Sequence, residues 1–137
     1  MNIFFIPSWY PSASHPLPGI FFRDQDLALA GHYPELKFGI SLWGQNEDRM
    51  LLWARQPFHS LGKVLTKSRY RSSVVSIAPN VEEFHKPAFT WTDKLLDGNL
   101  EQIIKANDHN LRKFELKHGK VDLIHAWGIL PATSPKN

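Results

Sequence analysis

The sequence feature that most constrains the fold is the alternation of short apolar runs with longer segments of helical periodicity. The apolar runs predict strands at Asn2–Ile6, Leu36–Trp43, Ser72–Ala78 and Val121–Ala126. The helical patterns lie at Gly19–Ala30 and at about Asp93–His118. Short apolar strands joined by helical crossovers are typical of a parallel sheet covered by helices on both faces. We therefore expect one α/β domain, in which the first and last strands are central or near-central and end at the same edge.

The boundaries between these elements are less uniform. Pro18 and Gly19 precede the first helical pattern, and Gly31 fits the position just after its last residue. Within residues 44–71, Met50–Ala54 fits either a strand or the start of a helix. We expect Pro79–Trp91 to be a long loop.

Composition narrows the class of protein. The chain has 137 residues, of which 42% are hydrophobic, so a packed core is expected. It has no cysteine, which excludes a disulfide scaffold, a thiolate zinc site and a cysteine nucleophile. The net charge of +3 is too small to indicate a nucleic-acid partner. No apolar run is long enough to predict a membrane span.

The loop after the first predicted strand, residues 7–19 (PSWYPSASHPLPG), is stiff and aromatic. In an open parallel α/β sheet, ligands bind outside the carboxyl ends of the strands, and this loop and Trp127–Pro131 both lie there. Gly19 stands at a helix N-terminus, which favours an anion and permits close approach. Trp9 and Tyr10 offer flat faces to a sugar or an apolar tail, unless they pack under the loop. The loop is neither a dinucleotide-binding G-x-G-x-x-G motif nor a P-loop.

On the first predicted helix, the apolar residues that indicate the buried face are Ile20, Leu27 and Ala28. The charged residues that we expect on a solvated face are Arg23, Asp24 and Asp26. Gln25 lies about one turn into the helix. It either hydrogen-bonds the first loop or faces solvent.

Two segments carry a resemblance to a known family. The first is PSWYPS followed by P-x-P-G-I-F-x-R-x-Q-x-x-A-L-A, and the second is VDLIHAWGILPAT near the other end of the chain. Together they resemble the N-terminal domain of glycosyl transferase family 4 (group 1) enzymes, which have the two-domain GT-B fold. Between the two segments, only the order of elements is similar.

The resemblance implies a Rossmann-like parallel sheet that forms the N-terminal, acceptor-side half of a GT-B fold. Such enzymes move a sugar from a nucleotide-diphosphate sugar to a glycan or lipid-linked acceptor, with retention of configuration and without a metal or other cofactor. Their C-terminal domain holds most of the nucleotide site. Ser134 and Pro135 are typical of the start of a helix, so we expect the sequence to be truncated at Asn137 and to lack that domain. We expect the chain alone to be inactive.

The resemblance also suggests site residues. Gly19 matches the family's first-loop glycine, and His125 matches the first histidine of an H-A-H motif whose second histidine is replaced here by Trp127. By itself, a histidine at a strand end is more often structural than catalytic. The strand-edge position and the family match of His125 leave a cleft-lining role and a structural role equally open. The residues that we expect to line the acceptor and donor-phosphate cleft are Trp9, Tyr10, Gly19, Gln25, His125 and Trp127. No catalytic residue is assigned.

A basic segment has no counterpart in these motifs. From position 49 to position 71 the chain has no Asp or Glu, and its cations are Arg49, Arg55, Lys63, Lys67, Arg69 and Arg71. A basic segment near anionic lipid gains about 1 kcal/mol per cation. Many members of the resembled family act at the inner membrane surface, so one interpretation is a cytoplasmic protein with peripheral membrane contact. The other is a basic surface whose apolar residues enter the core.

Two classes of function stay open from the sequence. The first is the N-terminal part of a retaining glycosyltransferase. The second is a non-catalytic Rossmann-like module that binds a sugar or a protein partner. A second domain carrying a pair of glutamates would distinguish the first class from the second.

Overall fold

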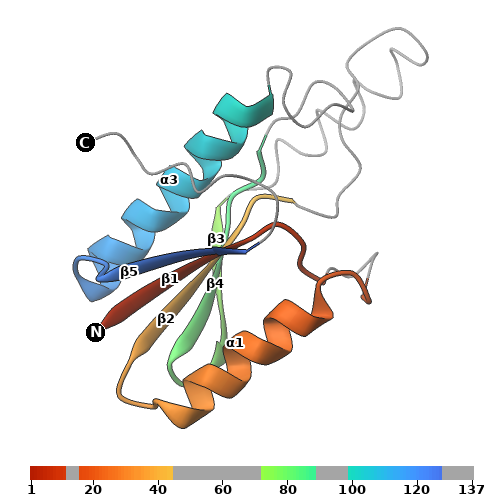
Figure 1. Cartoon of the computed structure of the whole chain (residues 1–137). Helices are drawn as coiled ribbons and strands as arrows, with labels where there is room; N and C mark the ends of the chain where they lie inside the picture. Colours follow the sequence, from red (N-terminus) through yellow and green to blue (C-terminus); the bar gives the residue numbers. More distant parts are fainter. Residues whose placement is uncertain (12–15, 45–71, 89–98, 128–137) are drawn as a thin grey trace, which may run out of the picture.

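The computed structural model describes residues 1–11, 16–44, 72–88 and 99–127 (Figure 1). In chain order, the elements of these residues are β1 (Asn2–Pro7), α1 (Ile20–His32), β2 (Lys37–Leu42), β3 (Ser73–Ala78), β4 (Val81–His85), α3 (Asn99–His118) and β5 (Leu123–Trp127). The strands form one sheet in the order β3-β4-β2-β1-β5, and α1 and α3 lie on opposite faces of it. The α/β fold with helices on both faces is therefore confirmed.

The sheet is mostly rather than wholly parallel. β1 pairs in parallel with β2 and β5, and β2 pairs in parallel with β4, but β3 runs antiparallel to β4. The expected long loop at Pro79–Trp91 is wrong over its described residues, because only two residues separate the end of β3 from the start of β4. Pro79 and Asn80 form a turn there, and a turn this short can only join antiparallel strands.

The positions of two other features also differ from expectation. β5 forms the edge of the described sheet, since its described pairing is with β1 alone, whereas a central or near-central place was predicted. Gly31 does not follow the helix but lies inside α1, which ends at His32. Both differences concern where an element stops or sits, and neither changes the layer arrangement.

β1 supplies core side chains to both faces of the sheet. Phe4 packs with Phe84 and Phe114 on the α3 face, with its ring centroid 5.4 Å from that of Phe114. Phe5 points to the α1 face and stacks on Phe38 at 5.8 Å. Successive strand residues point to opposite faces, so one strand anchors both helices.

A glycine on β2 makes room for the α3 side of this core. A β-carbon at Gly39 would lie 2.6 Å from Phe114 and 2.8 Å from Phe4, well inside contact distance. The two rings therefore lie directly over the backbone of β2. α3 is held close to the sheet at this point because Gly39 has no side chain.

The turn between β3 and β4 also caps α1. The side-chain amide of Asn80 donates to the carbonyl oxygens of Ala30, Tyr33 and Leu36 at 3.1–3.2 Å. Carbonyls at a helix C-terminus have no partner inside the helix, so an external donor satisfies them. Asn80 thereby ties the end of α1, and the turn that leads into β2, to the hairpin.

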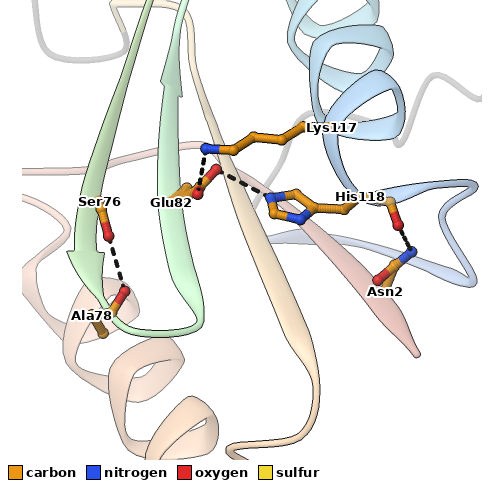
Figure 2. Close-up of polar contacts among 6 residues, drawn as sticks. All are labelled: Asn2, Ser76, Ala78, Glu82, Lys117 and His118. Carbon is orange, nitrogen blue, oxygen red and sulfur yellow. Dashed lines mark hydrogen bonds and ion pairs between the residues drawn. The ribbon is translucent and has the colours of Figure 1, made fainter.

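At the amino edge of the sheet, a second polar group ties α3 to the strands (Figure 2). Glu82 accepts hydrogen bonds from Lys117 at 2.7 Å and from His118 at 3.2 Å, and the amide of Asn2 donates to the carbonyl of His118 at 3.0 Å. Burial alone would raise the pKa of Glu82, but the bonds from Lys117 and His118 outweigh it and lower that pKa. The ionised carboxylate therefore stabilises the fold.

Asn80→Ala should lower the free energy of unfolding by about 2 kcal/mol, because it leaves helix-terminal carbonyls without their donor. Asn80→Asp keeps the size and removes the donor, so it should be similarly unstable. The control is Ser76→Ala in the same hairpin, where the exposed hydroxyl donates to the carbonyl of Ala78 two residues away. Urea unfolding measures all three variants. A loss for Asn80→Ala no larger than that for Ser76→Ala would contradict the capping role.

Glu82→Gln should lower the free energy of unfolding by about 1 kcal/mol at neutral pH. The loss is small because Lys117 is half exposed, so that solvent screens its charge. Since the native pKa of Glu82 is depressed, its contribution is present above the ordinary value of 4.5 and is lost as pH falls through the native pKa. The variant and wild type should therefore converge in acid unfolding. Glu101→Gln, which removes an exposed pair with Lys105, should change stability by less than about 0.5 kcal/mol.

Candidate functional site

Four parallel strands end at one edge of the sheet, where α1 also begins (Figure 1). The last residues of β1 and β5 are register partners, Pro7 with Trp127, and the last residues of β2 and β4 are partners, Leu42 with His85. The carboxyl edge therefore brings together the loop after β1 and the end of β5, which are more than a hundred residues apart in the sequence. This edge is the candidate site.

Tyr10 anchors the loop after β1 to the sheet through its buried side chain. The residue is 5% exposed, and its hydroxyl donates to Oε1 of Glu83 on β4. The other carboxylate oxygen of Glu83 lies 3.2 Å from Nε2 of His85. Burial would raise the pKa of Glu83, but the hydrogen bonds from His85 and Tyr10 lower it on balance. Because an ionised carboxylate only accepts hydrogen bonds, Nε2 of His85 carries the proton.

The hydrogen bond has the opposite effect on its donor. Burial, and then the bond to Glu83, raise the pKa of Tyr10 far above its ordinary value. Tyr10 is therefore a permanent donor. Its ring lies inside the protein rather than offering a face to a ligand, which is the alternative that the sequence left open for this residue.

Gly19 holds the start of α1 against the same segment. Its φ is +78°, and a β-carbon there would lie 2.4 Å from the carbonyl carbon of Trp9 and 2.5 Å from the backbone nitrogen of Tyr10. The close approach that Gly19 permits is thus to the chain's own backbone. The N–H groups of Ile20 and Phe22 already donate to the carbonyls of Leu17 and Gly19, so the helix N-terminus has fewer amides left for an anion.

Trp9 is an aromatic residue that faces solvent at this edge, with 48% of its surface exposed. Large apolar side chains exposed at the start of α1 are Leu17, Ile20 and Phe21. Ile20 and Ala28 were expected on the buried face of the helix but are exposed, so this part of the prediction is wrong. Together these exposed side chains form an apolar surface. Tyr10, next to Trp9, and Gly19, next to Ile20, hold its backbone in place.

The charged face of α1 is the largest correction to the sequence-based picture. Asp26, predicted to be solvated, is 1% exposed, and Arg23 is partly buried. The stripe of α1 that faces the sheet runs through Arg23, Asp26, Leu27 and Ala30, with Asp26 in place of an apolar residue. Gln25 is exposed, and among the described residues no hydrogen bond joins it to the first loop.

His125 lies on β5 opposite Phe5, with the two ring centroids 5.9 Å apart, and its side chain is exposed. Trp127 ends the same strand beside Pro7. Both residues belong to the carboxyl edge, as predicted from the strand pattern.

Glu83 and His85 were missed because they lie in the stretch that was expected to be a loop. The signal that could have found them is the turn pair Pro79-Asn80 after a strand, which is typical of a hairpin and predicts a second strand at once. Tyr10 and Glu83 are 73 positions apart, so no local pattern links them.

The basic residues Arg49 to Arg71 lie outside the described residues. Across the described ranges, no helix is both long and apolar enough to cross a membrane, and no group of His, Asp and Glu side chains is arranged to hold a metal ion.

Comparison with protein-family models, with curated proteins and with solved structures found no match.

Gly19→Ala should lower the free energy of unfolding by about 2 kcal/mol or more, because positive φ and contact with the Trp9–Tyr10 peptide both oppose a side chain. Gly31→Ala is the matched control on the same helix, where an added β-carbon meets nothing within 4 Å. It should be stabilising by about 0.5–1 kcal/mol. Thermal melting compares them, and equal melting temperatures for the two variants would contradict the anchoring role of Gly19.

Proposed function

We propose that this chain forms the acceptor side of a retaining glycosyltransferase, which moves a sugar from a nucleotide-diphosphate sugar to a glycan or lipid-linked acceptor. The proposal rests on the resemblance of residues 7–30 and 121–133 to glycosyl transferase family 4. The observation that supports it is the pairing of β1 with β5. This pairing places Pro7, at the start of the first resembling segment, beside Trp127, within the second, at the edge where open α/β sheets bind ligands.

In this proposal, Trp9 is the residue that contacts the acceptor sugar. Its ring is half exposed, while its backbone is fixed between the buried Tyr10 and the start of α1. A flat, immobile aromatic face binds the apolar face of a sugar ring with little loss of conformational entropy. His125, exposed on β5, would provide a polar contact at the same edge.

The roles of the other predicted residues are adjusted to their positions. Tyr10 and Gly19 would hold the first loop rather than contact the acceptor. Tyr10 is buried, and the space beside Gly19 is occupied by the backbone of Trp9 and Tyr10. The donor phosphates and the nucleotide would be held mainly by a second domain. Peripheral contact with the inner membrane surface is part of the proposal only for lipid-linked acceptors.

The test is ligand-observed NMR on this chain with oligosaccharides and, separately, with nucleotide-diphosphate sugars. We expect oligosaccharides to bind weakly, and Trp9→Ala to weaken binding about tenfold through loss of the stacked ring. Tyr33→Ala is the matched control, because Tyr33 is also 48% exposed but lies at the far end of α1.

Three outcomes would contradict the proposal. Equal losses for Trp9→Ala and Tyr33→Ala would remove Trp9 from the site. Absence of any saccharide binding at millimolar concentration would remove the acceptor role. Saccharide binding with no transfer by the protein encoded by the complete reading frame would instead favour the non-catalytic binding module.

A further inference from the structure

Asp26 is a buried carboxyl group without a compensating partner. It lies in the interface between α1 and the sheet, 1% exposed, and neither carboxylate oxygen has a hydrogen-bond partner among the described residues. Glu83, in the same interface, differs in having both Tyr10 and His85 as partners. An ionised carboxylate in the position of Asp26 would be strongly disfavoured, because it has lost its water and gained nothing in return.

The charged and titratable groups around Asp26 do not neutralise it in this arrangement. On its own helix, Arg23 lies one turn earlier, and its Nε is also buried without a hydrogen-bond partner among the described residues. In the first loop, the pKa of Tyr10 is affected by the charges of both Arg23 and Asp26. On β4, Glu83 is itself a carboxylate held by Tyr10 and His85, so among the described residues neither it nor His85 is a hydrogen-bond partner of Asp26. The packing of α1 therefore suits a neutral Asp26 and not a charged one.

We propose that Asp26 is a proton-operated latch: protonated, it allows α1 and the first loop to pack on the sheet, and ionised, it loosens that packing. Loosening would release α1 and the first loop together, because Gly19 packs the start of α1 against the Trp9–Tyr10 peptide. It would also let Asp26 pair with Arg23, three residues away on the same helix face. The carboxyl edge would thus open in response to pH. This inference does not depend on the proposed function.

The pH range follows from the burial of the group. Burial raises the pKa of Asp26 from 3.8 to about 7. Between these two values the folded chain binds a proton that the unfolded chain does not. Stability from this residue is therefore full below the unfolded pKa and is lost as pH rises through the folded one. The latch would close below neutral pH and loosen above it.

The first test compares the unfolding of wild type and Asp26→Asn at pH 5 and pH 8. Asparagine is a neutral mimic of the protonated acid, so the folding equilibrium constant of the variant, relative to wild type, should rise on the order of a hundredfold between the two pH values. Asp24→Asn, an exposed change on the same helix, should show no such dependence on pH. If the ratio of the two folding equilibrium constants, variant over wild type, is the same at pH 5 and pH 8, the proposal is overturned.

The second test uses the wild-type chain, so that it holds even if Asp26→Asn fails to fold. A ¹³C NMR titration should give Asp26 a midpoint near neutral pH, whereas a midpoint at the ordinary aspartate value would refute the latch. Hydrogen exchange, corrected for intrinsic rates, should speed up between pH 6 and pH 8 in α1 and residues 16–19 but not in α3. Equal changes in α1 and α3 would show that the titration acts on the whole fold and would also overturn the proposal.

Discussion

The constraint on which the rest of the structure depends is that β1 is buried on both faces. Phe4 joins the ring cluster under α3, and Phe5 stacks on Phe38 under α1, so one strand sets the positions of both helices. Its neighbours β2 and β5 hold it by parallel pairing on both sides. The loop that follows therefore starts from a point that cannot move without disrupting the core. A candidate site at this edge has a rigid base, which is what precise contact with a ligand requires.

The two edges of the sheet differ in how well their polar groups are satisfied. At the amino edge, Glu82 and Asn2 have partners of complementary charge or polarity, and the turn residue Asn80 satisfies the end of α1. Nearer the carboxyl edge, Asp26 and Arg23 carry buried atoms that lack partners among the described residues. Sequences usually agree with their folds at every level, and departures concentrate where function or strain makes them useful. The contrast therefore directs attention to α1 and the first loop.

Sequence reasoning recovered the parts of this fold that depend on local periodicity. β1, β2, β3 and β5 were found from apolar runs, and the layer arrangement followed from their alternation with helices. β4 was missed because two of its five residues are glutamates, so its apolar character is weak. The burial of Asp26 was missed because periodicity assigns faces by hydrophobicity, and here a carboxyl group occupies a position that faces the sheet. Both failures concern polar residues whose environment is created by distant segments.

The two buried carboxyl groups of the α1 interface show why such residues cannot be assigned from sequence. Glu83 and Asp26 have similar intrinsic acidity, yet partners lower the pKa of one and burial raises that of the other. Near neutral pH, Glu83 is a fixed anion that holds Tyr10, while Asp26 is close to the point where it gains or loses its proton. When environments push two acids apart in this way, their roles divide into an anchor and a proton carrier. The same interface between α1 and the sheet can therefore be fixed at Glu83 and responsive to pH at Asp26.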